Sequence, residues 1–251
     1  MLLLCAGKTC TITAMPTLVL ETSTPTASLL LVQVDGSVSP RSFQSDRSHN
    51  AELFRPLQEL MAEKPKLELV IAGSGPGSYS GTRVGIAAAQ GVAIAMACPA
   101  VAIPSILGLP GATARALVIG DARRGTCWTA KVAAGSLESP PELCEADELT
   151  RIIQHASDEG RAILTMEEPG RFPLANDLLA VIRREVPGAS GLWSAWQGAD
   201  PETRRRWLEE PPQPLYLKPP HITAAKRPWL VEQQGICISK IEPRMDTNSH
   251  E

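Results

Sequence analysis

The chain has 251 residues, which is enough to bury the core of one large domain or two small ones. Its 24 Lys and Arg and 27 Asp and Glu give a formal net charge of −3, and this near-balance argues against a free-standing nucleic-acid-binding protein of the basic class. The six cysteines contain no C-x-x-C pair, which excludes the usual spacing of a zinc site. We expect ordinary thiols in a reducing compartment.

The first half of the chain predicts alternating strands and helices, because continuous apolar runs alternate with apolar residues spaced along one helix face. In chain order, the expected elements are a hairpin at 17–36, a helix at 48–63 capped by Ser48 or Asn50, a strand at 66–73, a helix from about Thr82 to Ala97 and a strand at 100–105. The strand at 66–73 is apolar throughout, which is typical of a strand covered on both faces.

The second half repeats the opening order of strand, acidic end, polar turn and strand. Superposing Glu21 on Asp121 aligns the first hairpin with one at 115–135, which indicates a duplicated α/β unit. The remaining expected elements are a helix at 146–157, a strand at 161–166, helices at 174–185 and 200–209, and an extended proline-rich segment at 209–220. The expected domains are an extension at 1–14 with Met15 as the candidate start, a first lobe at 15–112, a smaller second lobe at 113–220 and a partly disordered tail at 221–251.

The stretch GSGPGSYSGTRVG, residues 73–85, is a glycine-rich loop before a helix, which is a common phosphate-binding arrangement. A Walker A loop requires a lysine in register, and none is present. A Rossmann fingerprint requires a third glycine, which is also missing. Two interpretations remain: free N–H groups at Ser78–Arg83 that bind an anion or a carbonyl, and a tight turn capped by its serines.

The helix after this loop carries little side-chain bulk. Gly85 and Gly91 each cost roughly 1 kcal/mol relative to alanine inside a helix, so close approach by another element is expected there. A helix of this kind must be buried either by its own fold or by another subunit. Although the run from Val84 to Ile103 has about the length of a membrane span, Pro99 interrupts it, and no membrane association is expected.

The stretch GPGSYSGTRVGIAAAQGVA at 75–93 resembles the GPGSFTGLRIGLATAKGLA signature of the TsaB (YeaZ) family. The stretches LVLETSTPTASLLL, SHNAELFRPLQELM, GDARRGTCWTAKV and PLYLKPP resemble further motifs of that family in the same order, so the resemblance covers about residues 17–220. Residues 140–200 match little of it.

The resemblance implies an α/β fold of two actin-like (ASKHA, ribonuclease H-like) lobes, with mixed sheets flanked by helices. It also implies a cytoplasmic, non-catalytic subunit that pairs with TsaD, is joined by the ATPase TsaE, and forms a homodimer when alone. The complex transfers a threonylcarbamoyl group to adenosine 37 of tRNAs that read ANN codons, and this chain contacts tRNA only through the complex. ATP and a divalent metal are expected in the partner subunits, with no cofactor bound strongly by this chain.

The resemblance assigns a partner interface to the glycine loop and the following helix, where small residues are expected to leave space for a helix of another subunit. Gly85→Leu or Ala88→Trp is expected to block this pairing without unfolding the monomer. The expected interface residues are Gly75, Pro76, Gly77, Ser78, Tyr79, Ser80, Gly81, Arg83, Val84, Gly85, Ala88, Ala89 and Val92. A vestigial nucleotide site or polar cluster is expected at Glu21, Thr22, Ser23, Asp121, Arg123 and Arg124. For the last three, a hairpin corner with solvated arginines is an equally good interpretation. Residues 48–52 are expected to be an ordinary capped helix start rather than a contact site.

The sequence departs from the family pattern at several positions, including Glu21 for Asp, Tyr79-Ser80 for Phe-Thr and Lys218 for Arg. The longer Glu21 carboxylate makes an active nucleotide site less favourable. Two other functions compete with the scaffold. An actin-like kinase requires a glycine for close phosphate approach where Ala122 and Arg123 stand. A glycoprotease-like peptidase requires an H-x-x-x-H pair, which the sequence lacks.

Overall fold

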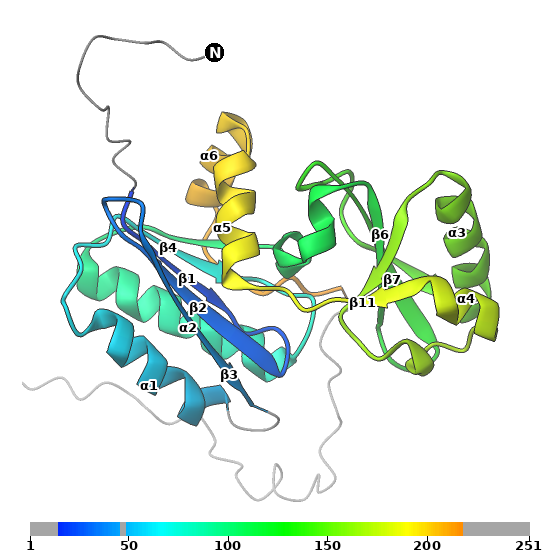
Figure 1. The fold of residues 1–251 in the computed structure, drawn as a ribbon, viewed down its shortest axis with the longest axis horizontal. Coiled ribbons are helices and arrows are strands. Elements are labelled where there is room, and N and C mark those ends of the chain that lie inside the picture. The colour runs from blue at the N-terminus through cyan, green and yellow to red at the C-terminus, as the bar shows by residue number, and fades with distance from the viewer. Residues whose placement is uncertain (1–14, 46–48, 218–251) are drawn as a thin grey trace, which may run out of the picture. The chain divides into compact units, whose positions relative to one another are not determined.

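The computed structural model describes residues 15–45 and 49–217, which form two mixed β-sheets flanked by helices (Figure 1). The expected α/β class with two mixed sheets is confirmed. The expected extension at 1–14 and tail at 221–251 lie outside the described residues, as do Ser48, the candidate helix cap, and Lys218.

The first sheet has the strand order β3-β2-β1-β4-β5. Its strands are β1 (Thr17–Glu21), β2 (Thr26–Val32), β3 (Val38–Gln44), β4 (Leu69–Gly73) and β5 (Ala100–Ile103). The first three strands form an antiparallel meander, and β4 and β5 continue the sheet in parallel with β1. Strands β1 and β4 are buried along their whole length because helices cover both faces of the sheet, which explains their continuous apolar sequences.

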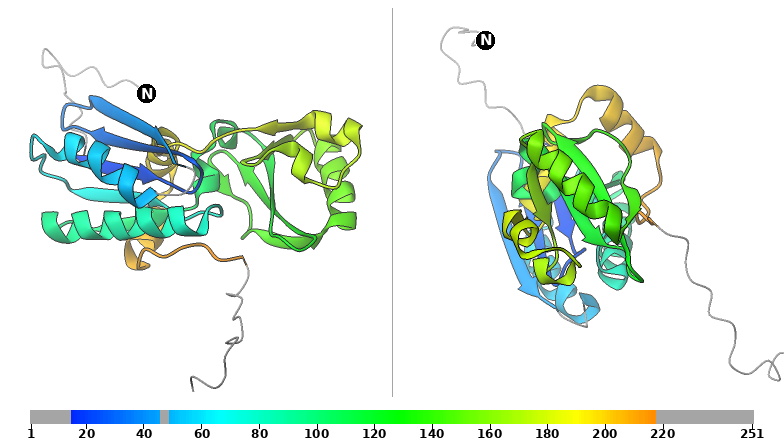
Figure 2. Two further views of the ribbon diagram at one scale, coloured as in Figure 1. Left: turned by 90° about the horizontal axis from the view of Figure 1, so that it is seen from below. Right: turned by 90° about the vertical axis from the view of Figure 1, so that its right-hand side faces the viewer.

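Two pairs of helices cover the two faces of this sheet (Figures 1 and 2). Helices α1 (His49–Met61) and α2 (Tyr79–Met96) lie on one face, and α5 (Ala189–Gly198) and α6 (Pro201–Glu209) lie on the other. Within residues 15–45 and 49–217, no helix is both long and apolar enough to cross a bilayer.

The second sheet has the strand order β11-β10-β6-β7-β8, with β9 also paired to β7. Its strands are β6 (Ala116–Asp121), β7 (Thr126–Ala133), β8 (Ser136–Leu137), β9 (Glu142–Glu145), β10 (Ala162–Thr165) and β11 (Ile182–Arg184), and its helices are α3 (Ala146–Asp158) and α4 (Asn176–Val181). Three short 3₁₀ helices, at Ser105–Gly108 (η1), Pro110–Thr113 (η2) and Pro169–Arg171 (η3), complete the connections.

The helix predicted over 174–185 is only partly present. Helix α4 ends at Val181, and the chain continues as β11, which pairs in parallel with β10 through Ile182 opposite Ile163. The hydrogen bonds offered by the exposed edge of β10 override the helical preference of the local sequence, which alone cannot reveal that edge.

Helices α5 and α6 fall in the range assigned from sequence to the second lobe, yet they pack on the first sheet. Helix α5 contacts β1, β2 and β4, and α6 contacts β5. One hydrophobic cluster joins side chains of both sheets and of these helices: Val19, Ile71, Ile103, Val118, Val132, Leu192, Trp196 and Trp207 belong to it. The second sheet is therefore followed in the chain by two helices that complete the first.

Candidate functional site

The glycine-rich loop joins β4 to α2, and its backbone N–H groups form hydrogen bonds to other parts of the chain. The N–H of Ser78 donates to the carbonyl of Ser23 at 2.6 Å, and the N–H of Gly75 donates to Oγ of Ser105 at 3.0 Å. Oγ of Ser78 caps the helix by accepting from the N–H of Gly81 at 3.2 Å, which starts α2 at Tyr79, earlier than the predicted Thr82. These bonds use N–H groups that an anion would need, so the geometry favours the capped-turn interpretation.

Three of the loop and helix glycines face the end of β1. A Cβ atom on Gly73 would overlap the carboxylate of Glu21, one on Gly77 would overlap the carbonyl of Ser23, and one on Gly85 would overlap Oγ1 of Thr22. The expectation that Gly85 leaves space for another subunit is therefore wrong, because Gly85 is buried and the space around it is filled by this chain. Gly85→Leu would damage the fold of the monomer.

Burial divides the expected interface residues into two groups. The buried ones are Gly75, Pro76, Gly81, Gly85 and Ala89. The exposed or half-buried ones are Gly77, Ser78, Tyr79, Ser80, Arg83, Val84, Ala88 and Val92. Only the second group is accessible on the surface of the described chain, and for it the interface remains a prediction.

The outer face of α2 and the neighbouring side of α1 form an apolar groove of about 740 Å³. Its lining consists of Arg83, Val84, Ala87, Ala88, Gly91, Val92, Ala95 and Met96 from α2, and Phe54, Leu57 and Met61 from α1. Phe54 is 59% exposed, which is unusual for a large apolar side chain unless another molecule covers it. Small residues of α2 make up much of this lining, so little side-chain bulk fills the groove.

An aromatic cluster flanks this groove near the start of α2. The guanidinium carbon of Arg83 lies 4.4 Å from the ring centre of Tyr79, and Nε of Arg83 donates to the hydroxyl of Tyr216 at 2.8 Å. Tyr216 belongs to the extended segment 210–217, which is also held by the side chain of Gln90, whose Nε2 donates to the carbonyl of Pro212 at 3.2 Å. The end of the described chain thus lies along α2.

The polar residues at the end of β1 are buried and form hydrogen bonds with the loop and the start of α2. Glu21 is fully buried, and its Oε1 accepts from the N–H of Ser23 at 2.7 Å. Oγ1 of Thr22 donates to the carbonyl of Gly81 at 2.8 Å. Burial raises the pKa of Glu21, although the hydrogen bonds from Ser23 partly offset that rise. Among the described residues, Oε2 of Glu21 has no hydrogen-bond partner.

The second expected polar group forms the tight turn between β6 and β7. Oδ1 of Asp121 accepts from the N–H of Arg123 at 2.6 Å, and both Arg123 and Arg124 have left-handed backbone angles, with φ of 66° and 60°. The side chains of these two arginines are exposed. This geometry agrees with the hairpin-corner interpretation. Thus Glu21 is hydrogen-bonded to Ser23, and Thr22 is hydrogen-bonded to Gly81 of α2. Asp121 is hydrogen-bonded within its own turn and to Glu167.

Several residues of these sites were absent from the sequence prediction. Glu167 follows β10, and its Oε2 accepts from the N–H of Asp121 at 3.3 Å. Burial raises the pKa of this carboxyl group. An acidic residue two positions after a buried parallel strand was the available signal. Phe54 and Met61 lie on the same side of a helix as Leu57, and their spacing indicated one apolar face but not that part of it is exposed. Nothing in the sequence indicated the contact of Tyr216 with Arg83.

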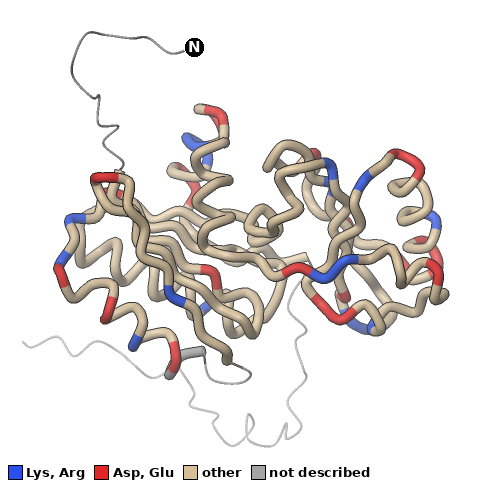
Figure 3. The backbone as a smooth tube through the Cα atoms, in the orientation of Figure 1, with Lys and Arg blue, Asp and Glu red and all other residues tan. Residues whose placement is uncertain are grey.

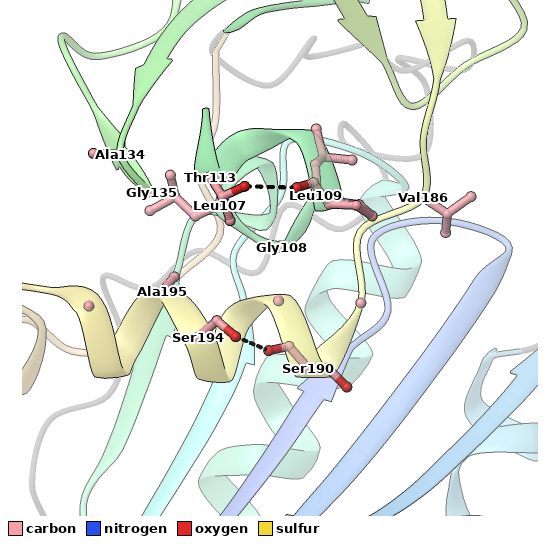
Figure 4. A pocket seen from close by; sticks show the side chains of 14 residues that line it. Leu107, Gly108, Leu109, Thr113, Ala134, Gly135, Val186, Ser190, Ser194 and Ala195 are labelled. Atoms are coloured by element: carbon pink, nitrogen blue, oxygen red, sulfur yellow. Dashed lines mark hydrogen bonds between the residues drawn. The ribbon is translucent and has the colours of Figure 1, made fainter. Parts of the chain in front are cut away.

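A second hollow, of about 620 Å³, lies beside α5 (Figure 4). It is lined by Leu107, Gly108, Leu109, Pro110, Thr113, Ala134, Gly135, Val186, Gly188, Ser190, Gly191, Ser194, Ala195 and Gly198, none of which is ionisable. Two of its three hydroxyl groups bond to nearby backbone: Oγ of Ser194 donates to the carbonyl of Ser190, and Oγ1 of Thr113 donates to that of Pro110. The described lining therefore offers no acid, base or charged nucleophile for catalysis.

Residues 28–177 match the family described as "TsaD: tRNA N6-adenosine threonylcarbamoyltransferase". The chain is 28% identical over 125 residues to the tRNA threonylcarbamoyladenosine biosynthesis protein TsaB of Escherichia coli K12, a match that covers 45% of this chain and 53% of that protein. It is 27% identical over 210 residues to an uncharacterized protein of Mycobacterium tuberculosis H37Rv, covering 81% of this chain and 92% of the relative. Thus the chain matches about half the length of the E. coli relative and most of the mycobacterial one.

Two solved structures from Pseudomonas aeruginosa share the fold. One is YeaZ, with a TM-score of 0.60 and 20% identity, covering 81% of this chain and 100% of that one. The other is an uncharacterized protein described as similar to peptidase YEAZ, with a TM-score of 0.62 and 20% identity, covering 82% of this chain and 100% of that one. At this identity the likeness concerns the fold alone.

Proposed function

The chain belongs to the tRNA N6-adenosine threonylcarbamoyltransferase family, as a protein of the TsaB (YeaZ) type, and on that premise we propose that it is a non-catalytic subunit of threonylcarbamoyladenosine biosynthesis. In this proposal it binds and activates TsaD, with TsaE joining the pair, and the complex modifies adenosine 37 of tRNAs that read ANN codons. The name of the E. coli relative supports the role in threonylcarbamoyladenosine biosynthesis, and the apolar groove on α1 and α2 supports the role as a binding subunit.

The observation that carries this proposal is the apolar groove on the outer face of α1 and α2. Small residues on α2 allow a second helix to approach closely, and exposed Phe54 and Met96 supply apolar area at its sides. Burying apolar surface contributes about 25 cal/mol per Å², so a covering helix would stabilise a complex substantially. The face is chemically suited to a protein partner, because an apolar groove offers a charged small molecule little to bind.

The buried state of Glu21 supports the non-catalytic part of the proposal. A nucleotide site in an actin-like kinase requires accessible carboxylates and open backbone N–H groups at the strand ends. Here Glu21 is fully buried under its own turn, and the N–H groups of Ser78 and Gly75 are bonded within the chain. We therefore assign ATP and divalent metal to the partner subunits, and contact with tRNA to the assembled complex.

The test is co-expression with the TsaD of the same organism, followed by size-exclusion chromatography at micromolar concentration. We expect a stable heterodimer with the unaltered chain and separate elution with Ala88→Trp, because the indole fills the groove. The matched control is Ala180→Trp, since Ala180 is an exposed helical alanine on α4, outside the groove. Separate elution of the unaltered proteins, or a normal heterodimer from Ala88→Trp, would contradict the proposal.

A further inference from the structure

We propose that Arg83 determines which partner occupies the groove, by binding a carboxylate carried by a helix of a different protein. This inference rests on the proposed function and adds the chemistry of recognition to it. Three features support it: the way the guanidinium is held, the distribution of charge around the groove, and the absence of a matching acid in a second copy of the same face.

The guanidinium of Arg83 is fixed in place while most of its donors stay available. It stacks on Tyr79 at 4.4 Å and is 5.9 Å from the ring centre of Tyr216. Among residues 15–45 and 49–217, its hydrogen bond is made by Nε, to the Tyr216 hydroxyl. The N–H groups on both Nη atoms therefore remain for a bidentate contact with a carboxylate. Because the side chain is already ordered, less conformational entropy is lost when a partner binds.

The side of the groove that α2 forms carries very little charge. Arg83 is the only charged residue in the 18 residues of α2. Elsewhere, Lys, Arg, Asp and Glu are spread along the described backbone, as Figure 3 shows. Arg83 is also the only charged member of the described lining of the groove. In the described part of the chain, Arg83 forms an ion pair with no carboxylate, so a partner that covers the groove must supply the anion or leave a buried cation unpaired.

A second copy of the chain is a poor match for this requirement. A two-fold dimer through the groove would bring two identical faces together, each with a cation and no acid in its described lining. The nearby carboxylate of Glu59 on α1 already pairs with Arg41 and Arg55, both at 3.4 Å. The charge pattern therefore favours a different protein over self-association.

A nucleic acid is also disfavoured by the same pattern. Binding a phosphate backbone requires several cations in a row, whereas the described lining provides one, within a surface that is otherwise apolar. Tyr and Arg are, however, the side chains that most often dominate the affinity of protein–protein interfaces. The combination of an apolar helix groove with one ordered arginine at its end fits an amphipathic helix that carries Asp or Glu near one end.

The experiment measures the affinity of the full chain for the cognate TsaD by isothermal titration calorimetry, at several salt concentrations. The variants are Arg83→Gln, Arg83→Glu, Arg83→Lys, Ala88→Trp and the control Arg205→Gln, an exposed arginine on α6 on the opposite side of the sheet. We expect Arg83→Gln to weaken binding by about 10- to 100-fold and to flatten the salt dependence, with Arg83→Lys between it and the unaltered chain. Arg205→Gln should bind normally.

A charge exchange identifies the partner residue directly. In the Arg83→Glu background, changing one Asp or Glu of the partner at a time to Arg should restore binding at a single position. Tyr216→Phe, which removes only the hydroxyl that orients Arg83, should weaken binding less than Arg83→Gln.

The outcomes separate this inference from the proposed function. If Ala88→Trp abolishes binding while Arg83→Gln binds like Arg205→Gln, the carboxylate contact is overturned and the proposed function stands. If Ala88→Trp binds normally, the groove is not the interface and both fail. A homodimer, or tRNA bound by the isolated chain, that Arg83→Gln weakens as strongly as the TsaD complex would also overturn the choice of partner.

Discussion

Small residues occur on both faces of α2, but they have different structural roles on the two faces. On the inner face, buried Gly85 makes room for Thr22 at the end of β1. On the outer face, a Cβ atom added to Gly91 would meet no described residue outside the helix's own backbone within 4 Å, and Ile94 is 81% exposed. A small residue therefore indicates close packing on one face and an open surface on the other. The difference lies in what the chain itself supplies opposite each position.

The largest expected effect comes from changing the inner face. Gly85→Ala should lower the free energy of unfolding of the isolated chain by about 1–3 kcal/mol, because its Cβ overlaps Oγ1 of Thr22, which is itself bonded to the carbonyl of Gly81. Urea denaturation measures this. Combining Gly85→Ala with Thr22→Ala should recover part of the loss. A stabilised Gly85→Ala variant would show that the inner face is loosely packed.

A smaller effect is expected at Glu21, beneath the same face. Burial raises the pKa of Glu21 above 4.5, so the folded state holds its proton at pH values where the unfolded state has lost it. The free energy of unfolding should therefore fall as the pH rises from about 4.5 to the folded-state pKa. Glu21→Gln cannot ionise and should remove this decline. The check is urea denaturation of both proteins between about pH 4.5 and 8. If the free energy of unfolding changes with pH in the same way for both, Glu21 is not a buried neutral carboxyl group in this range.

The smallest effect, of opposite sign, is expected on the outer face. Gly91→Ala should raise the free energy of unfolding by about 0.5–1 kcal/mol, because alanine favours the helix and its Cβ would lie in open space within the described part of the chain. Thermal denaturation of the isolated chain measures the stability of this variant, and Gly85→Ala is the matched comparison because it is the same substitution in the same helix. If both substitutions shift stability in the same direction, the contrast between the two faces is wrong.

Local patterns were sufficient to predict most of the strands and helices of this chain. The hairpin at 17–36, the strand before the glycine loop and the helices near 146–157 and 200–209 all have apolar patterns that their own packing explains. The strand β11 was missed because its pairing with β10 depends on a distant edge. The inner role of Gly85 was missed because Thr22 comes from another strand. The aromatic contact of Arg83 depends on Tyr216, which is 133 residues away in sequence.

The return of α5 and α6 to the first sheet has a consequence for synthesis on the ribosome. Strands β1 to β5 leave the ribosome first, but the face of that sheet covered by α5 and α6 stays open until residues 189–209 have been made. The second sheet is completed in the interval, so the two lobes cannot mature one after the other as independent units. A nascent chain that stops between β11 and α5 exposes Val19, Ile71 and Ile103 to solvent, which makes it a substrate for chaperones rather than a folded lobe.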